Sequence, residues 1–191
     1  EDHRTKSNRQ VGIMKKNHVF MMLNNFILPL TELSTIRKLL DYLTGLELGD
    51  LPTALSKNLV SSYYFFLRYI IQLTFISNGV WLLDIPHLIV KLIKKIIHYF
   101  KNRNALIKKD FVDDYAFDLG YHQSYCIVIF TITLVFSPVL PVISVFGFIF
   151  FMFKYNVDKY NLTFVYNREF EGGGIIKKMV MPYMVFSLYL F

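Results

Sequence analysis

The sequence predicts an all-α, polytopic membrane protein in which about five apolar helices cross a bilayer. Two observations lead to this fold class. The 191 residues are 54% hydrophobic and 17% aromatic, with a mean hydropathy of +0.38, whereas soluble domains carry fewer apolar residues and more charge. The charged residues, 18% of the total, cluster between long apolar stretches, as expected when those stretches lie in lipid and their connections in water.

The apolar stretches define the expected spans. The first is interrupted by Asn24, Asn25 and Pro29, so a buried or re-entrant helix is the alternative to a span there. The second carries Arg68 as its only charge and is longer than the roughly 30 Å hydrocarbon core. The expected arrangement is a cytoplasmic juxtamembrane tail at 1–17 and a transmembrane region at 18–191, with spans at about 18–33, 59–83, 119–137, 141–160 and 175–191.

The apolar stretch from about 121 to 153 is too long for one crossing and short for two. It is either one kinked helix or a helical hairpin that turns at Ser137, Pro138 and Pro141, because proline disfavours helix around itself. Cytoplasmic connections are enriched in Lys and Arg, and a hairpin places the three richest groups on one side. We therefore favour the hairpin, with its prolines at the outer face. The groups contain five Lys and Arg residues in 1–17, three in 34–58, seven in 84–120 and five in 154–178.

The segment 85–101 is strongly amphipathic and is expected to be a helix. A basic amphipathic helix at the end of a span is typical of a helix in the inner headgroup layer, and packing on a cytosolic domain is the alternative. Its apolar half contains Leu88, Ile89, Leu92, Ile93, Ile96, Ile97 and Phe100, and its polar half contains Lys91, Lys94, Lys95, His98 and Lys101.

No catalytic or metal-binding pattern is present, so neither an enzyme nor a cofactor is expected. Cys126 is the single cysteine, and the histidines do not lie at ligand spacing from it or from one another. The net charge of +7 does not indicate nucleic acid, because the basic residues lie in short groups beside the apolar stretches. The histidines are His3, His18, His87, His98 and His122.

Three further motifs contain polar residues or glycines. An acidic patch before the third span, which consists of Asp110, Asp113, Asp114 and Asp118, is a solvated loop, a helix N-terminal charge or a cation site. The glycines at 172–174 predict a flexible joint. Asn161, Leu162 and Thr163 match a glycosylation acceptor, but the expected orientation places them on the cytoplasmic side.

The second span has unusual polar content for a membrane helix. On a helical wheel one stripe contains Ser61, Phe65, Arg68, Gln72, Phe75 and Gly79, while Thr74, Ser77 and Asn78 lie on another side. An arginine inside a membrane is costly unless it faces a cavity, a partner or the interface. Arg68 therefore marks either a functional position or a structural ion pair.

The sequence resembles the OSCA and transmembrane protein 63 family of mechanically and osmotically gated cation channels, and more closely its animal transmembrane protein 63 branch. The matching positions cover nearly the whole chain. They are Glu1, His3, Thr5, Ser7, Leu28 and Pro29 near the start; Phe65, Phe66, Tyr69, Phe75, Ile76, Asn78, Leu82, Leu83, Ile85, Pro86 and Leu88 around the second span; and Tyr115, Phe117, Gly120, Phe130, Thr131, Ser137, Pro141, Phe146, Gly147, Lys154, Val157, Asp158, Tyr160, Asn161, Leu162 and Tyr166 from the third span onward.

The resemblance implies that the chain is a fragment of an eleven-span channel fold, in which span 59–83 is the main pore-lining and gating helix. It implies a calcium-permeable cation channel opened by membrane tension, with membrane lipids, monovalent cations and calcium as partners. The plasma membrane is the expected location and the endolysosomal membrane the alternative, and a monomer and a homodimer both remain open. The implied pore-lining or gating residues are Phe65, Arg68, Tyr69, Gln72, Phe75, Ile76, Asn78 and Gly79.

Two positions depart from the family pattern. Arg68 stands where the animal relatives carry a neutral Asn, and Asp84 is the nearest candidate for the acidic residue found near the inner end of the helix. A phospholipid scramblase of the same architecture is the alternative function, because a pore helix that separates from its neighbours would open a polar groove to lipid.

Overall fold

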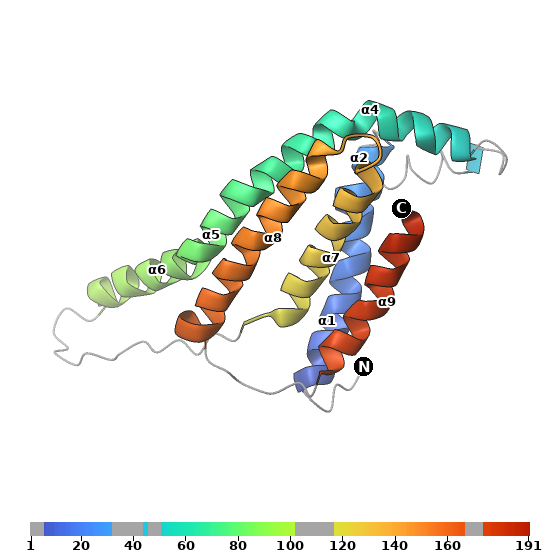
Figure 1. Cartoon of the computed structure of the whole chain (residues 1–191). Helices are drawn as coiled ribbons and strands as arrows, with labels where there is room; N and C mark the ends of the chain where they lie inside the picture. The colour runs from blue at the N-terminus through green and yellow to red at the C-terminus, as the bar shows by residue number, and fades with distance from the viewer. Residues whose placement is uncertain (1–5, 32–43, 46–50, 102–116, 167–173) are drawn as a thin grey trace.

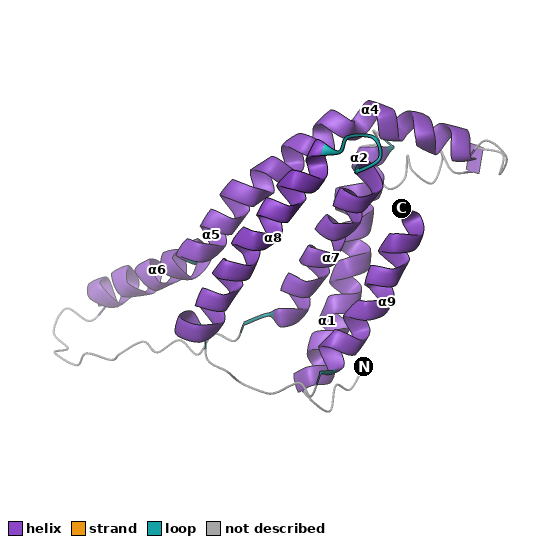
Figure 2. Ribbon diagram, viewed as in Figure 1, coloured by secondary structure: helices purple, strands orange, loops and turns teal. Residues whose placement is uncertain are grey.

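The computed structural model describes residues 6–31, 44–45, 51–101, 117–166 and 174–191, and within these ranges all regular structure is helical (Figures 1 and 2). The predicted all-α class is confirmed. In chain order the elements are α1 (Lys6–Met21), η1 (Met22–Ile27), α2 (Leu28–Leu30), α4 (Leu51–Gln72), η2 (Leu73–Ser77), α5 (Asn78–Leu83), α6 (Ile85–Lys101), α7 (Leu119–Phe136), α8 (Val142–Tyr160), η3 (Asn161–Val165) and α9 (Ile175–Leu190), where η marks a π-helical segment.

Helix α7 lies at the centre of the bundle and packs against α1, α4, α8 and α9. In Figure 1, α1 and α9 lie on one side of α7, and α8 followed by the rod of α4 and α5 lies on the other. The chain direction alternates along the bundle. As a result, the start of α1, the end of α5, the start of α7, the end of α8 and the start of α9 all lie at the same end (Figure 1).

The first helix differs from the expectation, because it begins at Lys6 rather than near residue 18. Its polar first half packs against the start of α7, where the Gln10 side-chain oxygen accepts a hydrogen bond of 2.8 Å from the Gly120 backbone N–H. The helix also continues past Asn24 and Asn25 through η1, and Pro29 occupies the first turn of α2. Proline is tolerated inside a membrane helix where a local π-helical adjustment, such as η1, satisfies the backbone groups that it frees.

The second helix is one rod from α4 through η2 to the end of α5. It begins at Leu51 rather than Leu59 and ends at Leu83, as expected. Asp84 then adopts a left-handed conformation with φ 47° and ψ 43°, and α6 begins at Ile85 in a new direction (Figure 1). Aspartate tolerates this backbone better than most residues with a β-carbon. The amphipathic segment is therefore a separate helix.

The third long apolar stretch folds as a hairpin of α7 and α8. Its turn contains Ser137, Pro138 and Pro141, and the Leu140 N–H donates a 2.9 Å hydrogen bond to the Phe136 carbonyl oxygen. The two helices approach closely near the turn. A β-carbon added to Gly147 on α8 would lie 2.5 Å from Thr133 Cγ2 on α7. Small residues at such contacts let membrane helices pack tightly.

Aromatic packing and one buried polar contact hold the helices together. The rings of Phe66 on α4 and Phe136 on α7 lie 4.3 Å apart, and both side chains are fully buried. The hydroxyl oxygens of Thr131 on α7 and Ser187 on α9 lie 2.7 Å apart. Lipid tails are as apolar as these side chains, so van der Waals contact and buried hydrogen bonds hold such a bundle together.

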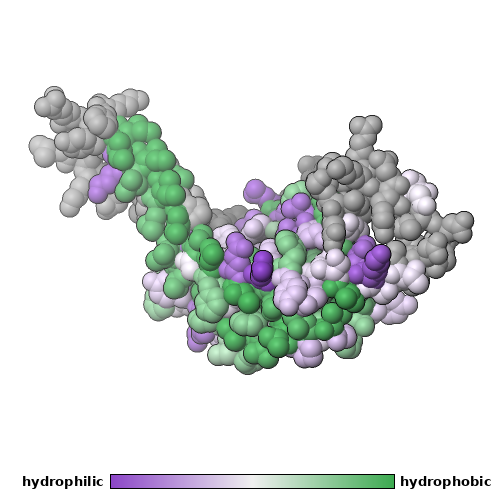
Figure 3. Space-filling view, turned by 90° about the horizontal axis from the view of Figure 1, so that it is seen from above, coloured by the Kyte–Doolittle hydropathy of each residue, from purple (hydrophilic) through white to green (hydrophobic). Residues whose placement is uncertain are grey.

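Within the described ranges, two helical stretches are long and apolar enough to cross a membrane: Ser56–Ile97, with 42 residues, and Leu119–Phe136. The first would extend about 63 Å as a continuous helix, about twice the hydrocarbon core. The change of direction at Asp84 divides it. Beyond that break α6 projects from the bundle as an arm, on which the apolar side chains of Leu88, Leu92 and Ile97 are exposed (Figure 3).

Candidate functional site

The rod of α4, η2 and α5 has one packed face and one open face. Its packed face contacts α7 and α8. The open face carries residues at helical spacing, and we call it the open stripe. Three of its apolar side chains are at least half exposed, with Phe65 at 50%, Phe75 at 58% and Ile76 at 59%. The open stripe consists of Phe65, Arg68, Gln72, Phe75 and Ile76, all exposed, and the packed face includes Phe66, Ile70, Leu73, Thr74 and Asn78, all buried.

A π-helical turn, η2 (Leu73–Ser77), interrupts this rod near its C-terminal end. Two buried side chains on the packed face bond back to the helix there. The Thr74 hydroxyl donates to the Ile70 carbonyl oxygen at 2.8 Å, and the Asn78 amide donates to the Thr74 carbonyl oxygen at 3.0 Å. Such bonds compete with the regular helical ladder, and π turns are frequent at functional sites. Helical periodicity does not encode this turn, although the Thr and Asn four residues apart are a weak signal for it.

A buried ionic cluster lies at the end of the hairpin away from its turn, and we define it as His122, Lys154 and Asp158. The Lys154 ammonium on α8 lies 2.5 Å from Asp158 Oδ1 and 2.8 Å from His122 Nδ1 on α7. Lys154 is 2% exposed and His122 is 4% exposed. Charges removed from solvent are costly unless they are paired and hydrogen-bonded, and these three groups meet that condition.

The geometry fixes the tautomer of His122. An ammonium group has only donors, so His122 Nδ1 accepts from Lys154 and the imidazole proton resides on Nε2. Lys154 also lies 5.8 Å from the ring centroid of Trp81, within reach of a cation–π interaction. Since Trp81 belongs to α5, the cluster connects the hairpin to the lower end of the rod.

Aromatic rings and one buried amide complete this connection. The His122 ring stacks on Phe117 at 4.3 Å and meets Trp81 edge-on at 4.6 Å. Asn161, fully buried at the start of η3, donates its amide to the Trp81 carbonyl oxygen at 3.1 Å. The same burial removes the amide nitrogen of this glycosylation motif from the surface.

The break after α5 is held by a side-chain pair. The Tyr166 hydroxyl donates a 3.1 Å hydrogen bond to Asp84 Oδ1, and the Tyr166 ring meets Phe117 edge-on at 5.2 Å. Burial, together with the nearby Asp84 carboxylate, raises the pKa of Tyr166 to about 12. The phenol is therefore a neutral donor at physiological pH, and it fixes the position where α6 leaves the rod.

A cavity of about 390 Å³ borders the ionic cluster and is lined by His122, Cys126, Tyr155, Asp158 and Lys159, among others. It contains no metal-binding set, since in the part of the chain that the structure describes no three His, Cys, Asp or Glu side chains are arranged so that they could hold a metal ion. Of the acidic patch only Asp118 is described, and it accepts the Tyr121 N–H at 3.2 Å as the N-cap of α7. Asp110, Asp113 and Asp114 lie outside the described residues.

Comparison with known proteins identifies the family. The sequence profile of the family described as calcium-dependent channel, 7TM region, matches residues 1–191. The chain belongs to this family. It is the OSCA and transmembrane protein 63 family, so the resemblance seen in the sequence is confirmed.

Three relatives show how far the similarity extends. The mechanosensitive cation channel TMEM63A of Mus musculus is 28% identical over 167 residues, 87% of this chain and 20% of that protein. The mechanosensitive cation channel TMEM63B of Gallus gallus is 25% identical, and the osmosensitive cation channel TMEM63C of Danio rerio is 26% identical; each match covers 100% of this chain and 24% of the relative. The chain thus spans about a quarter or less of these relatives.

Residues that carry the transmembrane protein 63 resemblance form the contacts around α5. Lys154 and Asp158 belong to the ionic cluster, Asn161 bonds to Trp81, and Tyr166 bonds to Asp84. Sequence reasoning missed this arrangement because it counted Lys154 with the basic residues of 154–178, although the span expected at 141–160 also includes it. The Lys and Asp four residues apart on one helix were the available signal.

The implied pore residues of this family member differ in exposure. Phe65, Arg68, Gln72, Phe75 and Ile76 form the open stripe, while Tyr69 and Gly79 are partly buried at its edges. Asn78 lies outside the open stripe, because it is 3% exposed and faces the packed side. Of the basic residues on α6, Lys95 is exposed, whereas the side chains of Lys91, Lys94 and Lys101 lie outside what the structure describes.

Proposed function

We propose that this chain forms part of a cation channel opened by membrane tension, with α4, η2 and α5 as its pore-lining and gating helix. The observation that carries the proposal is the open stripe. It combines exposed aromatic and aliphatic side chains with Arg68 and Gln72, on a rod whose other face is packed and hydrogen-bonded. The relatives are named as mechanosensitive or osmosensitive cation channels, which supports this assignment.

We further propose that the bundle crosses the membrane about five times, with α1 starting on the cytoplasmic side. The alternating directions of the helices support this number (Figure 1). Most of the Lys and Arg residues fall in 1–17, 84–120 and 154–178, around the helix ends that meet at the lower end of the bundle in Figure 1, and the cytoplasmic ends of spans are enriched in such residues. In this orientation the turn at Pro138 and Pro141 lies at the outer face, and α6 leaves the rod at the inner face.

Three features of the rod support a role in gating: its exposed apolar side chains, the π turn at η2 and the helix α6 that follows it. Phe65, Phe75 and Ile76 present apolar side chains that would exclude water from a narrow closed pore. The π turn at η2 supplies a place where the helix can change register or bend. Tension favours a state of larger area or different tilt, and α6, with its apolar side chains in the inner headgroup layer, would transmit that change to α5.

The permeant ions are proposed to be monovalent cations and calcium, conducted across the plasma membrane. Arg68 projects from the open stripe as a fixed positive charge, so cation preference would depend on the other pore-facing charges of the whole protein.

The gating role is tested by patch recording of the full-length channel under controlled suction. The Phe75→Ser variant is expected to lower the opening threshold, because a hydroxyl hydrates the constriction. A matched control is Phe20→Ser, since Phe20 is 65% exposed on α1 and is not in the open stripe. An unchanged threshold for Phe75→Ser, or an equal shift in the control, would contradict the assignment of the stripe to the pore.

Lipid scrambling is the second candidate. The open stripe alternates apolar rings with Arg68 and Gln72, and such a surface would also accommodate lipid headgroups if it opened toward the bilayer. Fluorescent-lipid exposure in proteoliposomes, measured beside stretch-activated current, separates the two activities: transfer without current favours scrambling, and current without transfer favours the channel.

A further inference from the structure

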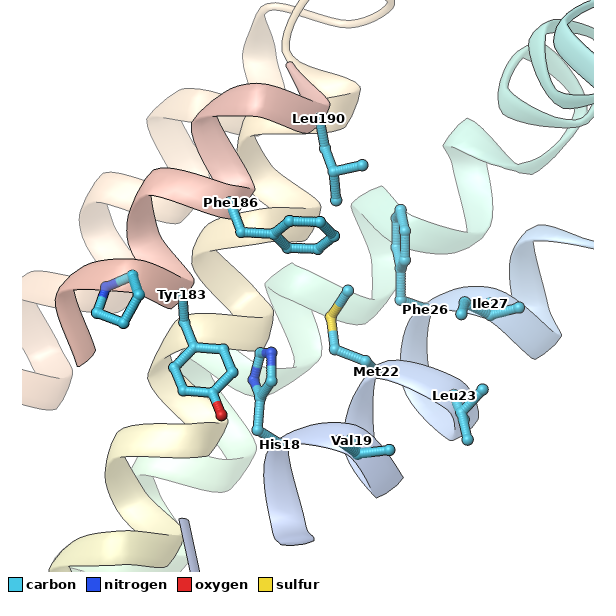
Figure 4. A pocket seen from close by; sticks show the side chains of 10 residues that line it. His18, Val19, Met22, Leu23, Phe26, Ile27, Tyr183, Phe186 and Leu190 are labelled. Carbon is cyan, nitrogen blue, oxygen red and sulfur yellow. The ribbon is translucent and has the colours of Figure 1, made fainter. Parts of the chain in front are cut away.

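An apolar groove of about 620 Å³ runs between the first and the last helix, away from the open stripe. Figure 4 shows Met22 and Phe26 of η1 facing Phe186 and Leu190 of α9 across it. The lining is almost entirely apolar, and His18 lies at one end. From His18 to Ile27 the groove follows the first helix for about 14 Å, which is close to half of the hydrocarbon core. Its length therefore fits one leaflet of a bilayer.

Basic residues gather at the His18 end of this groove. The two helices run in the same direction, and the His18 and Tyr183 rings lie 4.4 Å apart. Lys15 lies one turn before Val19, and Lys178 lies one turn before Pro182; Val19 and Pro182 both line the groove. Side chains on a helix lean toward its N-terminus, so these two exposed lysines extend beyond the apolar lining at the same end.

His18 adds a polar group just inside that end. It is 5% exposed, and its Nδ1 has no hydrogen-bond partner among the described residues. A buried polar atom without a partner is destabilising, so such atoms in native proteins are normally satisfied. Figure 4 shows the imidazole between Tyr183 and Met22, at one end of the apolar lining. A ligand that enters past Lys15 and Lys178 would reach this nitrogen first.

We propose that the groove binds one acyl chain of an anionic phospholipid of the inner leaflet. The phosphate lies between Lys15 and Lys178, an ester oxygen accepts a hydrogen bond from His18 Nδ1, and the chain follows Met22 and Phe26. The order of groups in such a lipid, from anionic headgroup through polar ester to apolar chain, matches the order of residues along the groove. The inner leaflet is the anionic one, so this assignment rests on the orientation given under the proposed function.

Photolabelling of the resting full-length protein tests the proposal without any measurement of current. The protein is reconstituted in phosphatidylcholine vesicles that contain a trace of phosphatidylserine with a photoactivatable group at the end of one acyl chain. We expect labelled peptides that contain Phe26 and Leu190, at the far end of the groove. Labelling by the phosphatidylcholine analogue should be about tenfold weaker, since two lysines attract the anionic headgroup.

Variants distinguish the parts of the site. Lys15→Ala with Lys178→Ala should remove the preference for phosphatidylserine, whereas Lys95→Ala, an exposed lysine on α6, should leave it unchanged. Met22→Trp, which fills the groove, should abolish labelling by both probes. Equal labelling by the two probes in the unmodified protein overturns the headgroup assignment. Absence of label from these peptides, or cross-links from them to another segment of the protein, overturns the lipid site. A loss of stretch-activated current with unchanged labelling counts against the proposed channel function and leaves the lipid site intact.

Discussion

Lys154 Nζ lies 2.8 Å from His122 Nδ1, and this contact joins the two arms of the α7–α8 hairpin inside the protein. The ammonium group is shared with Asp158 and faces the ring of Trp81 on the proposed gating helix. A charge placed here holds three helices at once. The hairpin thus acts as a support for the lower end of α5.

Removal of Lys154 should destabilise the protein strongly. In Lys154→Ala the Asp158 carboxylate stays largely buried without its cation, a situation that costs about 3–5 kcal/mol. We expect a lower unfolding temperature in detergent and weak expression. Lys154→Met with Asp158→Leu should recover most of the loss, because it removes both charges and keeps their volume. A double variant no more stable than Lys154→Ala would show that the ion pair is not the reason for the loss.

Substitution of Gly147 by alanine should destabilise the hairpin, whereas the same substitution at Gly79 should not. In Gly147→Ala the new methyl group would lie 2.5 Å from Thr133 Cγ2, and Thr133 is fixed by its own hydrogen bond to the Ile129 carbonyl oxygen. Overpacking of this kind costs about 1–3 kcal/mol, so the hairpin should separate and thermal stability should fall. Adding Thr133→Ala should restore it.

Gly79→Ala should instead leave the fold intact, since beyond its own turn of helix no atom of the described residues lies within 4 Å of the place that its new methyl group would take. Alanine favours helix over glycine by about 1 kcal/mol and would stiffen the rod just beyond the π turn. We expect normal thermal stability with a raised opening threshold in patch recordings. A fall in stability similar to that of Gly147→Ala would contradict the open surroundings of Gly79.

The Tyr166–Asp84 hydrogen bond predicts an alkaline limit of stability. The pKa of Tyr166 is raised to about 12, so the folded state favours the protonated phenol. The contribution is complete below the ordinary pKa of about 10 and is lost as the pH rises from there toward 12. Unfolding temperatures measured across this range should fall more for the unmodified protein than for Tyr166→Phe. Parallel curves would show that other groups cause the alkaline loss.

Much of the fold was predictable because local chemistry determines it. The prolines at 138 and 141 end and start helices, and the capping position of Asp118 and the left-handed Gly174, with φ 76°, mark the beginnings of α7 and α9. The early start of the first helix at Lys6 was not predicted, since hydropathy treats its polar residues as a tail. Packing against Gly120 stabilises that turn, and a contact between residues 110 positions apart leaves no local pattern.

Of the candidate site, the open stripe was predictable from the sequence and the ionic cluster was not. The stripe of Phe65, Arg68 and Gln72 follows from helical spacing alone. The ionic cluster depends on His122 and Lys154, which lie 32 positions apart and meet only because the hairpin turns where it does. Lys154 was counted with the basic residues of 154–178, and in the structure its side chain is buried within α8. The count of basic residues still supports the hairpin, because Lys177 and Lys178 remain at the same end of the bundle.

Arg68 provides a direct test of whether the open stripe faces ions. It is exposed on the same side as Phe65 and Phe75, and a positive charge in a pore repels cations. A unit charge about 10 Å from the ion path in water changes the local cation concentration by about twofold. Arg68→Asn should therefore increase cation current about twofold at low salt and move the reversal potential in a salt gradient toward that of a pure cation channel. Arg68→Lys keeps the charge and should leave both unchanged, and the effect of Arg68→Asn should shrink at high ionic strength because salt screens the charge. Identical reversal potentials for all three proteins at low salt would place Arg68 outside the ion path and favour an ion pair with another part of the channel.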